Sequence, residues 1–151
     1  MSKFHDNETL MDDRECLMEA LAANGKKAKL ATDQVNGDRL YGYQGDKRAD
    51  RAHIVIPRGQ LSDASNDIGF RREENGTYTA VVSEYDSQIG YGAEWLGGIR
   101  KTYLEKKKTK ELTTAGYTNI QREEVKTDAG TRIRITATPP AQQAAQMGFR
   151  R

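Results

Sequence analysis

The middle of the chain contains three short apolar segments in succession: Leu40-Tyr41-Gly42-Tyr43-Gln44-Gly45, His53-Ile54-Val55-Ile56-Pro57 and Asn66-Asp67-Ile68-Gly69-Phe70-Arg71-Arg72. Each segment is typical of a β-strand. Asn36-Gly37 precedes the first segment and Asn75-Gly76 follows the third, and this dipeptide is a strong signal for a tight turn. The middle of the chain is therefore predicted to fold as an antiparallel meander.

Two of these strands carry an internal glycine, Gly42 and Gly69. A glycine within a strand allows a ligand or another chain to come close to the backbone. It also occurs at a bulge, or where an aromatic side chain from the neighbouring strand lies over the gap. The structural interpretation is the more common one, and we expect it here.

Two amphipathic helices flank the meander. Asp12 followed by Glu15 resembles a capping box, so a helix is predicted from about residue 13 to residue 23. A second helix is predicted from about residue 92, because its apolar residues recur at offsets of three and four. A last hairpin is predicted over residues 117–136. The expected fold class is α+β, with a single antiparallel sheet, formed by the meander and the C-terminal hairpin, and two helices packed on one face.

The composition fits one compact domain. The chain has 151 residues, 36% of them hydrophobic and 30% charged, which is polar but well short of the disordered class. A single domain is expected over residues 1–138, followed by a flexible tail over residues 139–151. The net charge of +2 is too small to argue for nucleic-acid binding, although basic residues exceed acidic ones between residues 99 and 134.

The single cysteine, Cys16, excludes an internal disulfide and falls within a predicted helix, where a buried apolar role is expected. No apolar run approaches the ~20 residues that span a bilayer, and the N-terminus lacks an apolar signal segment. We therefore expect a cytoplasmic protein that does not enter a membrane.

Most recognisable catalytic motifs are absent from the sequence. It contains no phosphate-binding loop, no dinucleotide fingerprint and no His-Glu-x-x-His motif. The two histidines, His5 and His53, have no ligand spacing between them, so neither a metal nor a cofactor is expected. No catalytic residue is assigned. An enzyme with a site around His53 and acidic loop residues remains a third, weaker hypothesis.

Aromatic and basic side chains on the strands form a candidate binding surface. Stacking aromatics beside arginines are typical of proteins that bind single-stranded nucleic acid, although aromatic residues in strands more often lie in the core. The character of the sheet face that the helices leave uncovered would distinguish nucleic-acid binding from protein binding. An aromatic, basic face favours nucleic acid, and an apolar face favours a protein partner or self-association. The candidate residues are Tyr41, Tyr43, Arg71, Arg72, Arg132 and Arg134.

Several short motifs also occur in a recognisable order: Met1-Ser2-Lys3-Phe4, Ala20-Leu21-Ala22-Ala23-Asn24-Gly25, Tyr41-Gly42-Tyr43-Gln44-Gly45, Ala49-Asp50, Asn66-Asp67-Ile68-Gly69-Phe70 and the last hairpin. Over roughly residues 1–138 they resemble the family of proteins of unknown function numbered 1257, which includes the hypothetical chloroplast open reading frame 35 proteins of algae and cyanobacteria. Lys3 stands where the family often has histidine. The loop over residues 59–66 is longer than usual, and the tail after Pro140 is additional.

The resemblance implies a small α+β protein of bacteria, plastids and some phages, with gene neighbours that include an AAA-type ATPase. It implies no catalytic residues. The leading expectation is therefore a non-enzymatic accessory protein that binds a protein partner, such as an AAA-type ATPase or another larger complex. Single-stranded nucleic-acid binding is the alternative, and self-association is left open.

Overall fold

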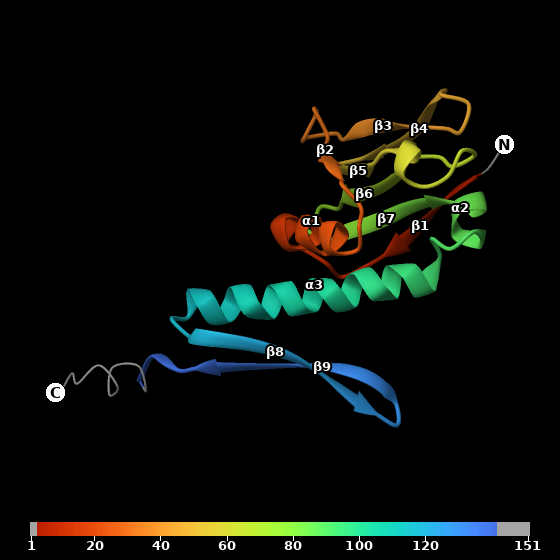
Figure 1. Cartoon of the computed structure of the whole chain (residues 1–151). Coiled ribbons are helices and arrows are strands. Elements are labelled where there is room, and N and C mark those ends of the chain that lie inside the picture. Colours follow the sequence, from red (N-terminus) through yellow and green to blue (C-terminus); the bar gives the residue numbers. More distant parts are fainter. Residues whose placement is uncertain (1–2, 142–151) are drawn as a thin grey trace. The chain divides into compact units, whose positions relative to one another are not determined.

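A computed structural model of the chain describes residues 3–141 (Figure 1). The chain divides into two compact units, Met1–Tyr103 (unit 1) and Leu104–Arg151 (unit 2). The predicted α+β class is confirmed. The elements, in chain order, are β1 (Phe4–Glu8), α1 (Arg14–Ala23), β2 (Lys29–Leu30), β3 (Asp38–Tyr41), β4 (Lys47–Ala52), β5 (Ile54–Ile56), a 3₁₀ turn (Arg58–Gln60), β6 (Ile68–Arg72), β7 (Tyr78–Ser83), α2 (Glu84–Gln88), α3 (Ala93–Thr114), β8 (Thr118–Thr127) and β9 (Gly130–Thr138).

The centre of unit 1 is a five-stranded antiparallel sheet with the strand order β1-β7-β6-β5-β2. β5, β6 and β7 form a meander, in which Val55 pairs with Gly69 and Gly69 pairs with Val81. The prediction was wrong for the first segment, residues 40–45, because β3 ends at Tyr41 and pairs with β4 in a separate sheet, which leaves Gly42 in the turn after the strand. The turn at Asn75-Gly76 joins β6 to β7, with Gly76 at φ 88°. β1 is an edge strand that pairs only with β7 in this sheet.

One face of this sheet carries the larger apolar core of unit 1. Because side chains alternate along a strand, Phe70 of β6 and Ala80 of β7 point to the same face. α1 and the beginning of α3 cover that face, and Leu17, Ile99 and Tyr103 are buried in the same cluster. The predicted apolar stripe of the second helix is therefore confirmed as a core-facing surface.

The β3–β4 hairpin covers part of the opposite face. Leu40 and Ala52 pack there against Val55 and Val81 in a second buried cluster. A side chain at Gly69 would collide with this layer, because its Cβ would lie 2.4 Å from the Cβ of Ala52. Gly69 thus has a structural role, as expected, but the covering atoms are those of Ala52 and Leu40 in the β3–β4 hairpin rather than an aromatic ring of the neighbouring strand.

The first helix begins one residue later than the Asp12 cap suggested. Asp13 is the N-cap, and its side chain accepts a hydrogen bond of 3.0 Å from the backbone N–H of Cys16. The backbone N–H of Asp12 and that of Asp13 both donate to the hydroxyl of Tyr103, each at 3.0 Å. Asp12 therefore serves the contact between α1 and α3 rather than the cap.

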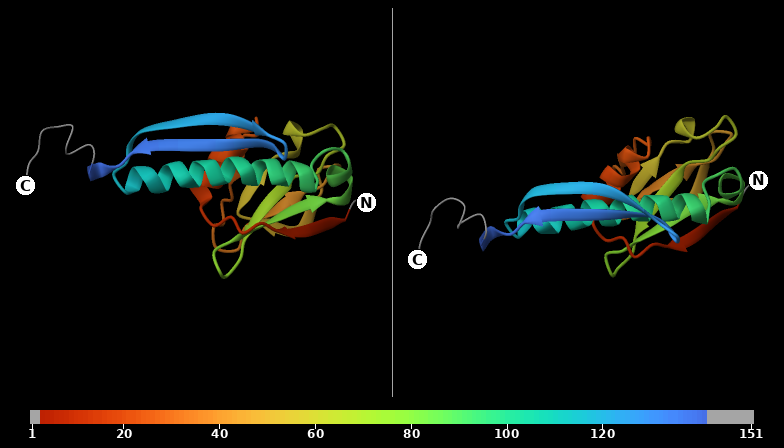
Figure 2. Two further views of the ribbon diagram at one scale, coloured as in Figure 1. Left: turned by 90° about the horizontal axis from the view of Figure 1, so that it is seen from below. Right: turned by 60° about the horizontal axis from the view of Figure 1, so that its bottom comes forward.

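Unit 2 contains the last turns of α3 and the hairpin of β8 and β9 (Figure 2). In the hairpin, Arg122 pairs with Ile135 and Glu123 pairs with Arg134. The predicted last hairpin is confirmed, but β8 and β9 form a sheet of their own, as do β3 and β4. Residues 3–141 thus form three sheets where one was expected.

Further differences concern the ends of elements and the domain division. The short helix α2 was not predicted. The single domain expected over residues 1–138 spans both units, whose boundary falls inside α3. The tail expected over residues 139–151 lies outside the described residues from residue 142 onward.

Candidate functional site

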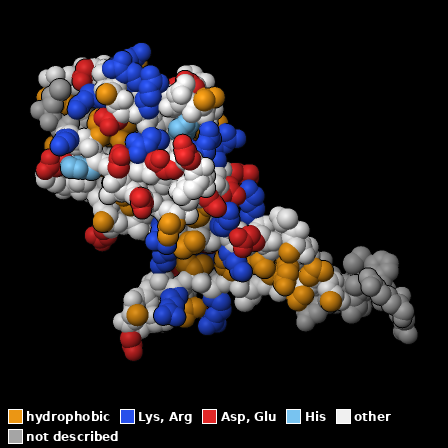
Figure 3. Space-filling model, turned by 180° about the vertical axis from the view of Figure 1, so that it is seen from behind, with side chains coloured by type: hydrophobic (Ala, Val, Ile, Leu, Met, Phe, Trp, Pro, Cys, Tyr) orange, Lys and Arg blue, Asp and Glu red, His pale blue; other side chains and the backbone are white. Residues whose placement is uncertain are grey.

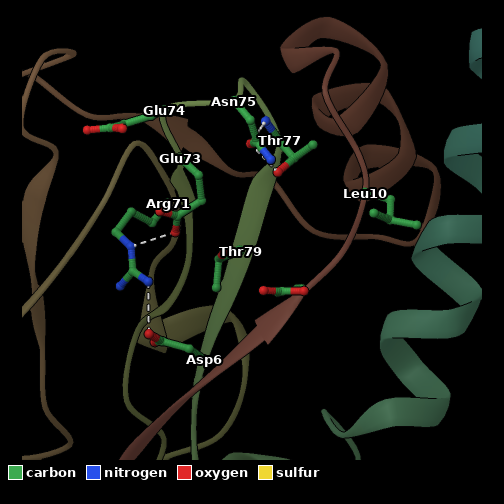
Figure 4. A pocket seen from close by; sticks show the side chains of 9 residues that line it. Asp6, Leu10, Arg71, Glu73, Glu74, Asn75, Thr77 and Thr79 are labelled. Carbon is green, nitrogen blue, oxygen red and sulfur yellow. Dashed lines mark hydrogen bonds and ion pairs between the residues drawn. The ribbon is translucent and has the colours of Figure 1, made fainter.

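An open pocket of about 680 Å³ lies on the sheet face that also carries the β3–β4 hairpin (Figure 4). Its lining comes from β1, β6, β7, the β6–β7 turn and the connection after β1. Thr79 pairs with Glu8 on one side and with Arg71 on the other, so the three side chains lie next to one another on that face. The lining residues are Asp6, Glu8, Leu10, Arg71, Glu73, Glu74, Asn75, Thr77 and Thr79.

The pocket is acidic, because four carboxylates surround one guanidinium. Arg71 donates to Asp6 at 2.8 Å and to Glu73 at 3.0 Å. The hydrogen bond with Asp6, supported by that with Glu73, raises the pKa of Arg71 above its ordinary value. Glu8 and Glu74 have no ion pair with any residue that the structure describes. The pocket therefore retains uncompensated negative charge.

The floor of the pocket contains a threonine. Thr79 as a residue is 4% exposed, and its side chain points into the pocket (Figure 4). Within residues 3–141, no group forms a hydrogen bond with its hydroxyl. A hydroxyl both donates and accepts hydrogen bonds, so that of Thr79 is available to a molecule that enters the pocket.

The signature residues Asn66 and Asp67 hold the surrounding loops together. The carboxylate of Asp67 accepts from the backbone N–H of Tyr41 at 2.8 Å and from that of Arg58 at 2.9 Å. The side-chain oxygen of Asn66 accepts from the backbone N–H of Tyr43 at 2.9 Å. These motifs, which characterise the sequence, therefore join the β3–β4 hairpin to the sheet.

Asn66 also reaches a fully buried carboxylate, that of Asp86. Asp86 Oδ2 accepts from the backbone N–H of Asn66 at 3.0 Å and from the hydroxyl of Ser83 at 2.6 Å. Ser83 is the N-cap of α2, and its hydroxyl accepts from the backbone N–H of Asp86 in return at 3.0 Å. Asp86 Oδ1 receives no hydrogen bond from the described residues. The arrangement fixes the start of α2.

A second charged surface lies on the outer side of the β3–β4 hairpin, where Lys and Arg side chains gather (Figure 3). Arg39 lies directly opposite Arg51 in the ladder, and Tyr41 lies opposite Lys47. Arg39 donates to the carbonyls of Arg48 and Lys47, and Arg51 donates to the carbonyl of Gly37 at 2.7 Å. Neither Arg39 nor Arg51 forms an ion pair with a carboxylate among residues 3–141. The sequence analysis did not include Arg39 and Arg51 among the candidate binding residues. The alternation of residues along the two strands would have been enough to predict that they share a face.

The β8–β9 hairpin of unit 2 buries little. None of the described residues of unit 2, 104–141, is classed as buried. Glu105 pairs with Arg122, and this contact raises the pKa of Arg122, so the hairpin face that carries Arg122 and Ile135 lies toward α3. Each strand has one edge without a strand partner within this two-stranded sheet.

The six predicted binding residues do not form one surface. Arg71 is paired in the acidic pocket, whereas Arg72 points to the other face of β6 and donates to the carbonyl of Gln34 at 2.7 Å. Phe70 and Tyr78, the central aromatics of the sheet, are buried beneath the helices. In unit 1, Tyr41 and Tyr43 are 39% and 37% exposed. In unit 2, Arg132 and Arg134 share one face of β9.

His53 is packed in the sheet. Its Nδ1 accepts from the backbone N–H of Arg72 at 2.9 Å, and its Nε2 lies 3.2 Å from the carbonyl of Val35. Both ring nitrogens of His53 therefore lie against backbone groups of the chain. Within residues 3–141, no group of three or more His, Cys, Asp or Glu side chains is placed to hold a metal ion.

No helix in the described part of the chain has the length and apolar character needed to cross a membrane. No curated protein and no solved structure matches the chain. A family model does match: the one described as a protein of unknown function (DUF1257) covers residues 27–135. This range contains the strands of the meander, the signature residues Asn66 and Asp67, and most of the last hairpin. By this match over more than half of its length, the chain belongs to the DUF1257 family.

Proposed function

We propose that the protein is a non-enzymatic accessory protein that binds a protein partner through the β8–β9 hairpin. The observation that supports this most strongly is the lack of buried residues among residues 104–141. An isolated two-stranded hairpin is marginally stable in water. Its unpaired strand edges offer backbone donors and acceptors to another strand. A partner that adds a strand at one edge would supply the burial that the hairpin lacks.

The sequence of β9 suits this role. Thr131, Ile133 and Ile135 have high β propensity and share one face. Arg132 and Arg134 alternate with them on the other face. Arg134 forms an ion pair with Glu123 of β8 at 2.9 Å, so the charges of the hairpin partly balance one another. The strand edges can then be recognised through the hydrogen bonds of their main chain.

Hydrogen exchange on the purified full chain, alone and after addition of an extract from its source cells, tests the proposal. The amides of β8 and β9 should exchange more slowly in the recovered complex than in the free chain. The amides of α1, which face a complete core, should exchange equally in both and serve as the internal control. A chain that elutes alone after this treatment, with hairpin exchange unchanged, would contradict the proposal.

Binding of single-stranded nucleic acid is a second candidate, and the outer face of the β3–β4 hairpin favours it. Arg39 and Arg51 are held in place by backbone carbonyls, and the half-exposed ring of Tyr41 lies on the same face. Unpaired cations beside an aromatic ring suit a phosphate backbone with stacked bases.

Retention of a labelled oligonucleotide at low salt, lost as the salt concentration rises, would support this second candidate. The double variant Arg39→Ala with Arg51→Ala should weaken retention more than Arg132→Ala with Arg134→Ala, which makes the same change in charge on β9. Equal effects of the two double variants, or no retention at low salt, would rule out this face.

A further inference from the structure

From the acidic pocket of unit 1 we infer a binding site for the basic side chain of a peptide segment, an arginine or lysine that follows or precedes an apolar residue. The site lies on the face of β1, β6 and β7, and its lining includes no residue of the β8–β9 hairpin of the proposed function. It therefore does not depend on that function, and each can fail without the other.

The first ground is charge. Within the pocket, Arg71 partly neutralises the negative charge of Asp6 and Glu73 through its two ion pairs. Glu8 and Glu74 face the pocket without a cation among the described residues. A ligand that carries a positive charge is therefore favoured, and an anionic one is repelled.

The second ground is the hydroxyl of Thr79. The residue is only 4% exposed, its side chain points into the pocket, and no described residue forms a hydrogen bond with its hydroxyl (Figure 4). A hydroxyl oxygen accepts hydrogen bonds, and ammonium and guanidinium groups only donate them. A cationic N–H group placed between Thr79 and Glu8, which are direct partners across β7 and β1, would satisfy both.

The size and the rim of the pocket favour a peptide over an ion. A volume of about 680 Å³ is far larger than a bare metal ion requires, and no metal-binding group of side chains exists in the described chain. Leu10 lines the pocket on the side away from Arg71 and Glu73 (Figure 4) and is 70% exposed. The carbon stem of a lysine or arginine, or an apolar neighbour on the same peptide, can pack against this leucine.

Fluorescence anisotropy of a labelled peptide of alternating leucine and arginine, with the full-length chain at low ionic strength, tests the inference. The double variant Glu8→Gln with Glu74→Gln should weaken binding about tenfold, the sum of two exposed charge pairs. The matched control is Glu19→Gln with Glu94→Gln, which changes the same charge at exposed positions of unit 1 outside the pocket and should leave the affinity unchanged.

Two further variants separate specific recognition from general electrostatic attraction. Arg71→Gln frees Asp6 and Glu73 and should strengthen peptide binding, whereas Arg72→Gln, with the same charge change on the other face of β6, should not. Thr79→Val keeps the branched shape of the side chain, removes the hydroxyl and should weaken binding severalfold. Circular dichroism melts establish that each variant is folded.

Three results would overturn the inference. The first is the absence of peptide binding to the wild-type chain. The second is an equal loss of affinity in the pocket variants and in their matched controls, which would indicate attraction to the whole acidic surface. The third is binding of free spermidine, sensitive to Glu8→Gln with Glu74→Gln, without binding of the peptide, which would assign the pocket to a small polyamine.

Discussion

The β6–β7 hairpin of unit 1 and the β8–β9 hairpin of unit 2 share a local design, since each joins two antiparallel strands through a turn that contains a glycine at positive φ. Their surroundings differ. Every residue of β7 is buried, because β1 and β6 flank the strand, the helices cover one of its faces and the β3–β4 hairpin covers Val81 on the other. No residue of β8 or β9 is buried. A hairpin that is part of a core is stable through its own packing, whereas one in which no residue is fully buried is available for binding.

The largest expected difference is in the cost of an Ile→Ala substitution to the free energy of unfolding, compared between the two hairpins. Ile68→Ala removes a fully buried side chain from β6 and should cost about 2 to 5 kcal/mol in the free energy of unfolding. Ile133→Ala in β9, where the side chain is only half-buried, should cost about 1 kcal/mol or less. Urea unfolding of the two variants measures both values, and equal costs would contradict the contrast.

The second largest effect on the free energy of unfolding is expected where the β3–β4 hairpin closely approaches the sheet. Gly69→Ala forces the hairpin away from β6 and should cost about 1 to 3 kcal/mol. Ala52→Gly removes the colliding methyl group, so the double variant should be less destabilised than the two single costs added together. The control is Gly97→Ala in α3, where nothing lies within 4 Å of the new methyl group. Strict additivity at residues 52 and 69 would show that the hairpin is not held in this position.

A smaller effect is expected where α1 meets α3. Tyr103→Phe leaves two backbone N–H groups, those of Asp12 and Asp13, without their acceptor and should cost about 1 to 2 kcal/mol. Burial raises the pKa of Tyr103 above its ordinary value of 10.0. Its contribution is therefore complete below pH 10.0 and is lost as the pH rises through the folded-state pKa. The stability gap between wild type and Tyr103→Phe should narrow in this alkaline range; a constant gap would show that the hydroxyl does not ionise as a buried group.

The smallest effect is expected in the loop before β3. Hydrogen bonds from the backbone N–H groups of Thr32 and Asp33 lower the pKa of Asp38 below its ordinary value of 3.8. This carboxylate therefore stabilises the fold above that value, and its contribution is lost as the pH falls through the lower folded-state pKa. Asp38→Asn should cost less than the ~1 kcal/mol of a typical net hydrogen bond. Thermal melts should show the difference from wild type vanishing in acid, and a difference that grows there would reverse the assignment.

Much of the fold could be predicted from local pattern. The apolar stripe that includes Ile99 and Tyr103 predicted which face of the second helix packs on the core, and the two Asn-Gly pairs predicted turns. Both signals depend only on residues that are close in sequence. The division into three sheets could not be predicted in this way. Whether β9 pairs with the meander or only with β8 depends on contacts between distant segments, which alternation along one strand does not encode.

The candidate sites show the same limit more strongly. The prediction grouped Tyr41, Arg71 and Arg132 by residue type, but the pleat sends Arg71 and Arg72 to opposite faces of β6. The acidic pocket brings Asp6 together with Glu73 across β1 and β6, which are far apart in sequence. The basic pair Arg39 and Arg51 was accessible in principle, since it needs only the register of one hairpin.

Hydrogen exchange of the free full-length chain tests most directly the claim that unit 1 is self-sufficient and that the hairpin of unit 2 awaits a partner. The amides of β6 and β7 are expected to exchange only through global unfolding, and those of β8 and β9 to exchange orders of magnitude faster through local opening. Protection of β8 and β9 equal to that of β6 and β7, in a chain shown to be monomeric, would contradict the account.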